Sequence, residues 1–232
     1  MFGTIVNVLA IIVGTVLGLI FKKGIPERAK ETIFSAIGLV VLLIGLKMGM
    51  QANNELILII SLVLGGVVGE TMRLDDHLNG LGEKLYKIAG SKESTFIQGF
   101  VTASLIYSIG AMATLGPLEA GLKANYQLLY IKSTLDGITS ILLGSTFGIG
   151  VAFAAIPVFF YQGMVTLFAG ALESILTEVV VTYLSATGGL LIAAIGLNML
   201  LKRDIKVANL LPAIVISVLI TMVAVVYFPA MI

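Results

Sequence analysis

One segment of membrane length keeps a lysine and an aspartate inside an otherwise apolar, small-residue run. It extends over residues 128–150 and carries Lys132 and Asp136 one helical turn apart. Read as a helix of 3.6 residues per turn, it places Thr139 and Thr146 on the same polar face as the two charges. An ionised side chain at bilayer depth costs about 2.5 to 3.5 kcal/mol on insertion scales, so such residues usually face a bundle interior or a wet cavity. We therefore predict that Asp136 is a functional residue.

The same spacing has a structural interpretation. Lys132 and Asp136 lie four residues apart, so they can neutralise each other and fix this helix against its neighbours. An adjoining stripe of small residues allows another helix to approach closely. This stripe consists of Ser133, Gly137, Ser140, Gly144 and Gly148. Polar residues in neighbouring segments favour a site over a purely structural pair.

The composition is that of an integral membrane protein. Of 232 residues, 58% are hydrophobic and 12% charged, with a mean hydropathy of +1.08, whereas soluble domains carry about 25% charged residues. Cysteine is absent and histidine occurs once, which argues against thiol chemistry and cysteine or histidine metal sites. We expect no metal, no cofactor and no nucleic-acid partner, and the lipid bilayer as surroundings.

Apolar runs close to the length of about 20 residues that crosses a bilayer recur along the chain. Short polar loops separate most of them, so the sequence predicts an all-α, polytopic transmembrane bundle of about eight spans in a single domain, residues 1–232. The predicted spans cover residues 3–21, 32–50, 56–72, 95–116, 128–150, 157–172, 182–201 and 208–228.

Three local patterns refine this prediction. The first span carries Gly3, Asn7, Gly14 and Gly18 on one face, so we expect it to be packed inside the bundle. The sequence Gly116-Pro117 is expected to end the fourth span, leaving Glu119 and Lys123 in a loop. Residues 75–90 have the amphipathic spacing of a helix lying in the membrane interface.

The distribution of lysine and arginine predicts the orientation. Loops 22–31, 73–94 and 202–206 hold eleven of the fourteen Lys and Arg residues, and the positive-inside rule places them in the cytoplasm. Eight spans then put both termini outside the cell. Between spans five and six there is no charged loop, so we expect irregular backbone, which is tolerated at membrane depth only where protein or water covers it. Residues suited to supply it are Gly144, Gly148, Gly150 and Pro157.

Two spans resemble each other in sequence. Residues 38–48 read GLVVLLIGLKM and residues 189–199 read GLLIAAIGLNM, identical at six of eleven positions. Because units five spans apart cross the membrane in opposite directions, we predict an inverted repeat. Spans one to three (1–72) and six to eight (157–228) would be its halves, with spans four and five (95–150) between them. Secondary transporters are commonly built in this way. Alternatively, Gly-, Leu- and Ile-rich helices resemble each other by composition alone.

A second similarity relates FIQGFVT, residues 96–102, to FYQGMVT, residues 160–166. We expect both motifs to open their spans, so that Gln98 and Gln162 enter the bundle at the same depth. An amide offers donors and an acceptor, so both are candidate gate or ligand groups. Alternatively, they link helices by hydrogen bonds.

Five segments of the chain are distinctive together. They are GTIVNVLAIIVG, KKGIPERAKETI, KSTLDGITSILLGSTFGIG, IPVFFYQG and GLLIAAIGLNML. With these segments the chain resembles the YdfK/YqgA-like family of small bacterial inner-membrane proteins. The resemblance covers nearly the whole chain and implies a bacterial plasma-membrane protein of similar span count. It carries over no catalytic residues.

Our first hypothesis is a secondary transporter or permease for a small solute. Asp136 would couple a proton or cation, with Lys132 as its charge partner. The other candidate ligands are Asn7, Gln98, Thr102, Thr139, Ser140, Gln162 and Asn198. No phosphate loop, zinc-protease motif or nucleophile elbow occurs, so we expect neither an enzyme nor ATP-driven transport by this chain alone.

Three alternatives remain. One is an ion or solute channel formed by a homo-oligomer, for which glycine-rich faces predict a dimer. Another is a non-transporting membrane scaffold that uses residues 75–90 as its contact surface. An intramembrane enzyme is disfavoured because Glu70, Asp136 and Glu178 belong to different spans at unlike expected depths.

Overall fold

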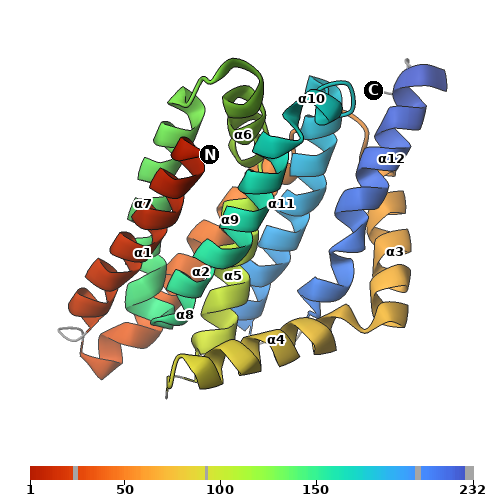
Figure 1. Cartoon of the computed structure of the whole chain (residues 1–232). Helices are drawn as coiled ribbons and strands as arrows, with labels where there is room; N and C mark the ends of the chain where they lie inside the picture. The colour runs from red at the N-terminus through yellow and green to blue at the C-terminus, as the bar shows by residue number, and fades with distance from the viewer. Residues whose placement is uncertain (23–25, 92–93, 202–204, 228–232) are drawn as a thin grey trace. The chain divides into compact units, whose positions relative to one another are not determined.

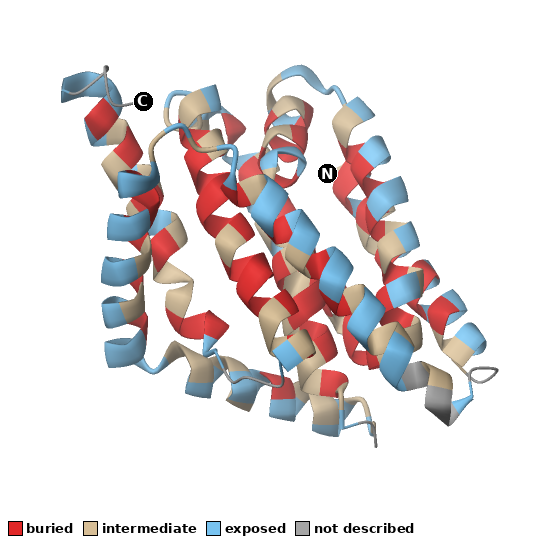
Figure 2. Cartoon of the chain, turned by 180° about the vertical axis from the view of Figure 1, so that it is seen from behind, coloured by how far each residue is buried: buried red, intermediate tan, exposed pale blue. Residues whose placement is uncertain are grey.

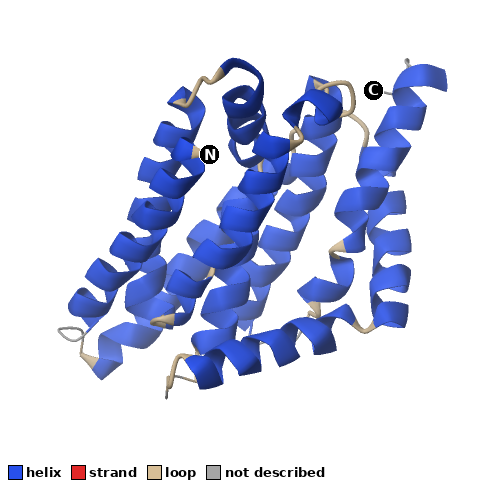
Figure 3. Ribbon diagram, viewed as in Figure 1, coloured by secondary structure: helices blue, strands red, loops and turns tan. Residues whose placement is uncertain are grey.

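The computed structural model of the chain describes residues 1–22, 26–91, 94–201 and 205–227, and these form helices without strands (Figure 3). Within these ranges, six helices are long and apolar enough to cross a membrane, or seven if a bent pair counts as one span. The prediction of a helical transmembrane protein is confirmed. Four charged loop residues used for the orientation lie outside the described residues, as does the predicted end of the last span at 228. They are Lys23, Lys92, Lys202 and Arg203.

The chain divides into two compact units. The first comprises Met1–Ile37, Asn79–Ser108 and Met112–Leu172, and the second comprises Gly38–Leu78, Ile109–Ala111 and Glu173–Ile232. Helices α2 (Glu27–Gly49) and α4 (Leu74–Ile88) contribute residues to both. The first unit otherwise contains α1 (Phe2–Lys22), α5 (Phe96–Ser108), most of α6 (Ala111–Lys123), α7 (Gln127–Phe147), α8 (Gly150–Phe153), α9 (Ala155–Leu167) and α10 (Ala169–Leu172) (Figure 1). The second contains α3 (Glu55–Met72), α11 (Glu178–Leu201), the 3-10 helix η1 (Val207–Leu210) and α12 (Pro212–Tyr227).

In the first unit, α1 and α7 pack side by side and run in the same direction (Figure 1). Gly3 of α1 faces Leu129, whereas Gly18 faces Ser145. Residue numbers therefore increase in the same direction along both helices, which are parallel. At Gly14 an added Cβ would lie 2.9 Å from the Cβ of Ser140. The helices approach this closely because both present small residues.

Only the glycine face of α1 is buried, so the expectation that α1 is packed inside the bundle is wrong for its other faces (Figure 2). Phe2 is 62% exposed, Val13 56% and Ile20 61%. An exposed face of this kind suits a helix at the lipid boundary, where apolar side chains cost nothing.

In the second unit, α2 and α11 run antiparallel through a glycine-mediated contact. Gly38 faces Met199, and Gly189 faces Met48. Nearer the middle, a Cβ added at Gly45 would meet Ala193 and one added at Gly196 would meet Leu42. Most of α11 is buried, as Figure 2 shows.

The fourth predicted span is broken rather than ended by proline. Helices α5 and α6 meet at a bend of 58°, and Gly110 between them has a φ of 122°. This backbone conformation interrupts a right-handed helix and suits glycine. Pro117 lies within α6, which continues to Lys123. The expected end at Gly116-Pro117 is therefore wrong, and Glu119 and Lys123 are helical.

The backbone also changes course after α7. This helix ends at Phe147, and Gly148 follows with a φ of 84°. The short α8 begins at Gly150, where an added Cβ would collide with the carbonyl of Phe96. Pro157 is the third residue of α9, in the first turn, where a proline removes no intrahelical hydrogen bond.

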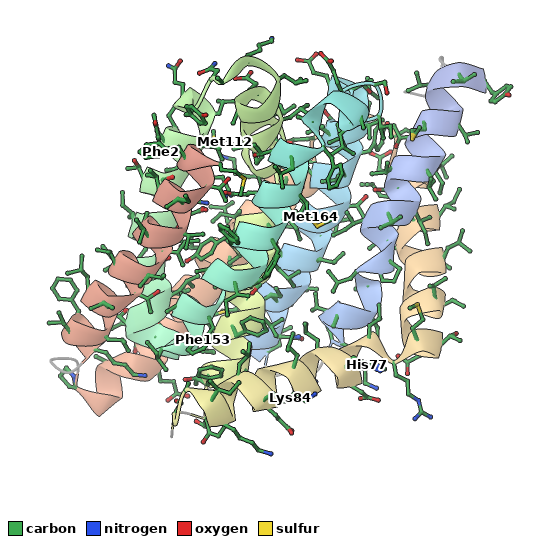
Figure 4. The ribbon with its side chains drawn as sticks, in the orientation of Figure 1. Phe2, His77, Lys84, Met112, Phe153 and Met164 are labelled. Carbon is green, nitrogen blue, oxygen red and sulfur yellow. The ribbon has the colours of Figure 1, made fainter. Side chains whose placement is uncertain are left out.

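Helix α4 has the amphipathic sequence expected for residues 75–90. Its Gly82 packs against Ile97, and its Tyr86 ring meets Phe96 edge-on. Both His77 and Lys84, labelled in Figure 4, are exposed. Helix α4 therefore packs against α5 on one side and exposes polar side chains on another.

Candidate functional site

The predicted charges of α7 form a buried ion pair. The Nζ of Lys132 donates a hydrogen bond to Oδ2 of Asp136 at 2.7 Å. The two residues are only 5% and 6% exposed. The ionic partner and the hydrogen bonds from neighbouring groups offset part of the cost of burying this carboxylate.

A second helix completes this carboxylate site. The side-chain amide of Asn7 on α1 donates a hydrogen bond to the same Oδ2 of Asp136 at 3.0 Å. Asn7 is fully buried, and its own Oδ1 has no hydrogen-bond partner within the described ranges. The bond depends on the close parallel packing of α1 on α7, which brings residues 129 positions apart into contact.

A buried hydroxyl pair lies one turn further along α7. Ser140 is hydrogen-bonded to the hydroxyl of Tyr107 on α5 at 2.7 Å, and both residues are buried. Thr102 of α5 is also buried, at 1% exposure. Sequence reasoning included Ser140 and Thr102 among the candidates but missed Tyr107. A tyrosine far from the interfacial positions usual for this residue was the available signal.

Three other candidates lie in different surroundings. Gln98 is half-buried near the start of α5. Thr139 is half-buried and donates a hydrogen bond to the carbonyl of Leu135 in its own helix. Asn198 belongs to the second unit, where its amide donates to the Ile205 carbonyl at 2.8 Å and accepts from the Ile205 N–H at 2.9 Å.

Gln162 is fully buried on α9, and neither its Oε1 nor its Nε2 has a hydrogen-bond partner among the residues described. It is the eighth residue of α9, whereas Gln98 is the third of α5. The expectation that both motifs open their helices is therefore wrong, because α9 already begins at Ala155.

A single carboxylate oxygen is the shared acceptor of this arrangement. Oδ2 of Asp136 accepts from an ammonium and an amide at once. A proton or cation that occupied this oxygen would compete with Lys132 and release its ammonium group. In the described part of the chain, no three histidine, cysteine or carboxylate residues gather as metal ligands.

Comparison with known proteins agrees with the resemblance in the sequence. The "Uncharacterized membrane protein YdfK" of Bacillus subtilis (strain 168) is 38% identical over 220 residues, covering 93% of both chains. The "Uncharacterized protein YqgA" of Escherichia coli (strain K12) is 27% identical over 220 residues, covering 93% of this chain and 94% of that one. No solved structure matches the chain. The family model described as "Protein of unknown function (DUF554)" matches residues 2–222, so the chain belongs to the DUF554 family.

Proposed function

We propose that this membrane protein is a secondary transporter for a small solute in the bacterial plasma membrane. Asp136 takes up the coupling proton or cation, and Lys132 is its charge partner. The observation that carries the proposal is the buried pair itself, bonded to Asn7 of a second helix. Ionisable groups within membrane helices are expensive and commonly belong to ion or substrate pathways.

An eight-span arrangement agrees with the direction of the helices in the first unit. Its spans are α1, α2, α3, the bent pair α5–α6, α7, α8–α9, α11 and η1–α12. In this order α1 is the first span and α7 the fifth, so both cross the membrane in the same direction. Their parallel packing supports this count. Helix α7 has 21 residues, which is sufficient to span, although it is not among the six helices that are apolar enough on their own.

An inverted repeat is supported by the contact between α2 and α11 in the second unit. The two helices begin at Glu27 and Glu178, an offset of 178 − 27 = 151. The contact of Gly38 with Met199 has a counterpart at this offset in the contact of Gly189 with Met48. Any antiparallel pair of helices makes such reciprocal contacts; a pseudo-twofold axis in the membrane plane requires in addition that the similar segments 38–48 and 189–199 meet each other, and these two segments are in contact.

The glycine faces do not favour a homo-oligomeric channel or a scaffold. Those of α1 and α2 are occupied by α7 and α11 of the same chain. Gly65 and Gly69 of α3 likewise lie against Ala213 and Asn209. No second copy is needed to cover them.

The test is flux through proteoliposomes. Proton entry is followed with a pH-sensitive dye and sodium entry with ²²Na⁺, under an imposed membrane potential and across a range of pH. We expect wild-type protein to carry one of these ions and Asp136→Asn to lose that flux. Asp76→Asn, the same change at an exposed residue of α4, should retain it. Equal flux in wild type and Asp136→Asn would remove Asp136 as the coupling group.

A further inference from the structure

The first unit holds a group of buried polar atoms that the ion pair does not use. Both amide atoms of Gln162 lack partners among the described residues, as do Oδ1 of Asn7 and Oγ1 of Thr4. All three side chains are 0% exposed. Each buried polar atom left unpaired costs about 1–3 kcal/mol, so native structures normally satisfy such atoms with water, an ion or a ligand.

Helix packing places these atoms at a similar level. A Cβ added at Gly163 of α9 would lie 3.3 Å from the terminal methyl of Met1, so the first turn of α1, with Thr4, is at the level of Gln162. Asn7 follows one turn later. The neighbouring Tyr161 is hydrogen-bonded to Thr114 of α6 at 2.9 Å.

Helix α7 reaches the same level. Both Gly3 of α1 and Gly116 of α6 lie against Leu129, which is three residues before Lys132. Gln162 is therefore about one helical turn from Lys132 along the bundle. The unpaired amide and the ion pair thus share one depth range of the first unit, a polar layer that includes residues of α1, α6, α7 and α9.

This region is polar but has no excess charge, because Lys132 and Asp136 neutralise each other. Burial of a further charge here would carry a large desolvation cost, whereas an uncharged ligand avoids it. The free carbonyl and the free NH₂ of Gln162 lie side by side on one group. An amide is a small neutral group that satisfies both, through two parallel hydrogen bonds.

We infer that Gln162 is the recognition group for a small uncharged molecule that carries an N–H donor beside a C=O acceptor. This inference rests on the proposed function and names the substrate class of the same site. The unpaired hydroxyl of Thr4 and the unpaired carbonyl of Asn7, at a similar level on α1, are the candidates for further hydrogen bonds to this molecule.

The experiment measures binding without transport. Saturation-transfer NMR detects acetamide on the protein in nanodiscs, with empty nanodiscs as background and N,N-dimethylacetamide as the analogue that lacks N–H donors. We expect transfer to acetamide only. In Gln162→Leu, acetamide should bind about tenfold more weakly, since two hydrogen bonds are lost. Gln127→Leu, an exposed glutamine, and Thr187→Val, a buried unpaired hydroxyl of the second unit, should bind as wild type does.

Gln162→Leu should also raise the melting temperature, because it removes two unpaired buried atoms; this measurement verifies that the variant folds. Equal transfer to both probes, or unchanged acetamide binding in Gln162→Leu, would overturn the inference. Acetamide binding without ion flux would refute the transporter but keep the amide site. Ion flux without acetamide binding would refute the amide site but keep the transporter.

Discussion

Variants of the ion pair of α7 show how the stability of the protein depends on both buried charges together. Breaking such a pair costs about 3–5 kcal/mol, because one charge stays buried and unpaired, whereas replacing both partners by apolar groups is often neutral. We predict that Asp136→Leu and Lys132→Met each lower the melting temperature of the purified protein. The double variant should recover most of the loss while remaining inactive in the flux assay.

The exposed pair between Lys206 and Glu70 provides the control. Its atoms are 3.8 Å apart and its side chains 50% and 65% exposed, so Lys206→Met should cost only about 0–1 kcal/mol. Additive losses in the double variant of Lys132 and Asp136 would show that the two charges are not coupled.

At the scale of single residues, the sequence predicted the contacts that depend only on spacing within one helix. Lys132 and Asp136 pair four residues apart within one helix, as their positions on its polar face allow. Their partner Asn7 was a candidate, but its bond to Asp136 depends on which helices are neighbours, and periodicity does not contain that information. The same holds for Tyr107 and Ser140, 33 residues apart.

At the scale of the helices, the site depends on the close approach of α1 and α7. A Cβ at Gly14 would collide with the carbonyl of Gly137. We predict that Gly14→Ala separates the helices, weakens the bond from Asn7 to Asp136 and destabilises the protein by about 1–3 kcal/mol. Thermal unfolding measures the change.

Gly170 is the matched control, since an added Cβ there meets nothing within 4 Å. Gly170→Ala should leave the melting temperature unchanged or raise it slightly, because alanine favours the helix. If both variants unfold at the wild-type temperature, the packing of α1 on α7 is looser than described here.

The lengths of the apolar runs predicted where the helices lie, but they did not predict where a helix is interrupted. Pro117 was expected to end a span, yet the interruption lies at Gly110. Glycine occurs both at close helix contacts and at turns, and only the backbone angle separates the two uses. Similarly, the glycine face of α1 indicated its packed side, but the sequence did not reveal that the remaining faces are exposed.

For the whole molecule, the orientation depends on the number of spans. Among the described residues, six helices are long and apolar enough to cross a membrane, and the bent pair α5–α6 makes a seventh candidate. The eighth span, α7, is the helix that carries the ion pair. The polar residues that identify the site also lower the hydropathy by which a membrane span is recognised. With the basic loops inside, residues 50–54 and 124–126 lie outside in either count, whereas residues 173–177 lie outside only if α7 crosses the membrane.

Single cysteines distinguish the two counts, since the chain contains none of its own. We predict that cysteines replacing Asn53, Asn125 and Ser174, all exposed, react with a membrane-impermeant maleimide in right-side-out vesicles. A cysteine at Gly80 of α4, where a side chain meets no neighbour within 4 Å, should react only after permeabilisation. If α7 does not span, α8–α9 runs in the opposite direction and Ser174→Cys is protected while Asn125→Cys still reacts. That outcome would remove both the eight-span order and the inverted orientation of the two repeat halves, because the fifth crossing is what reverses the second half.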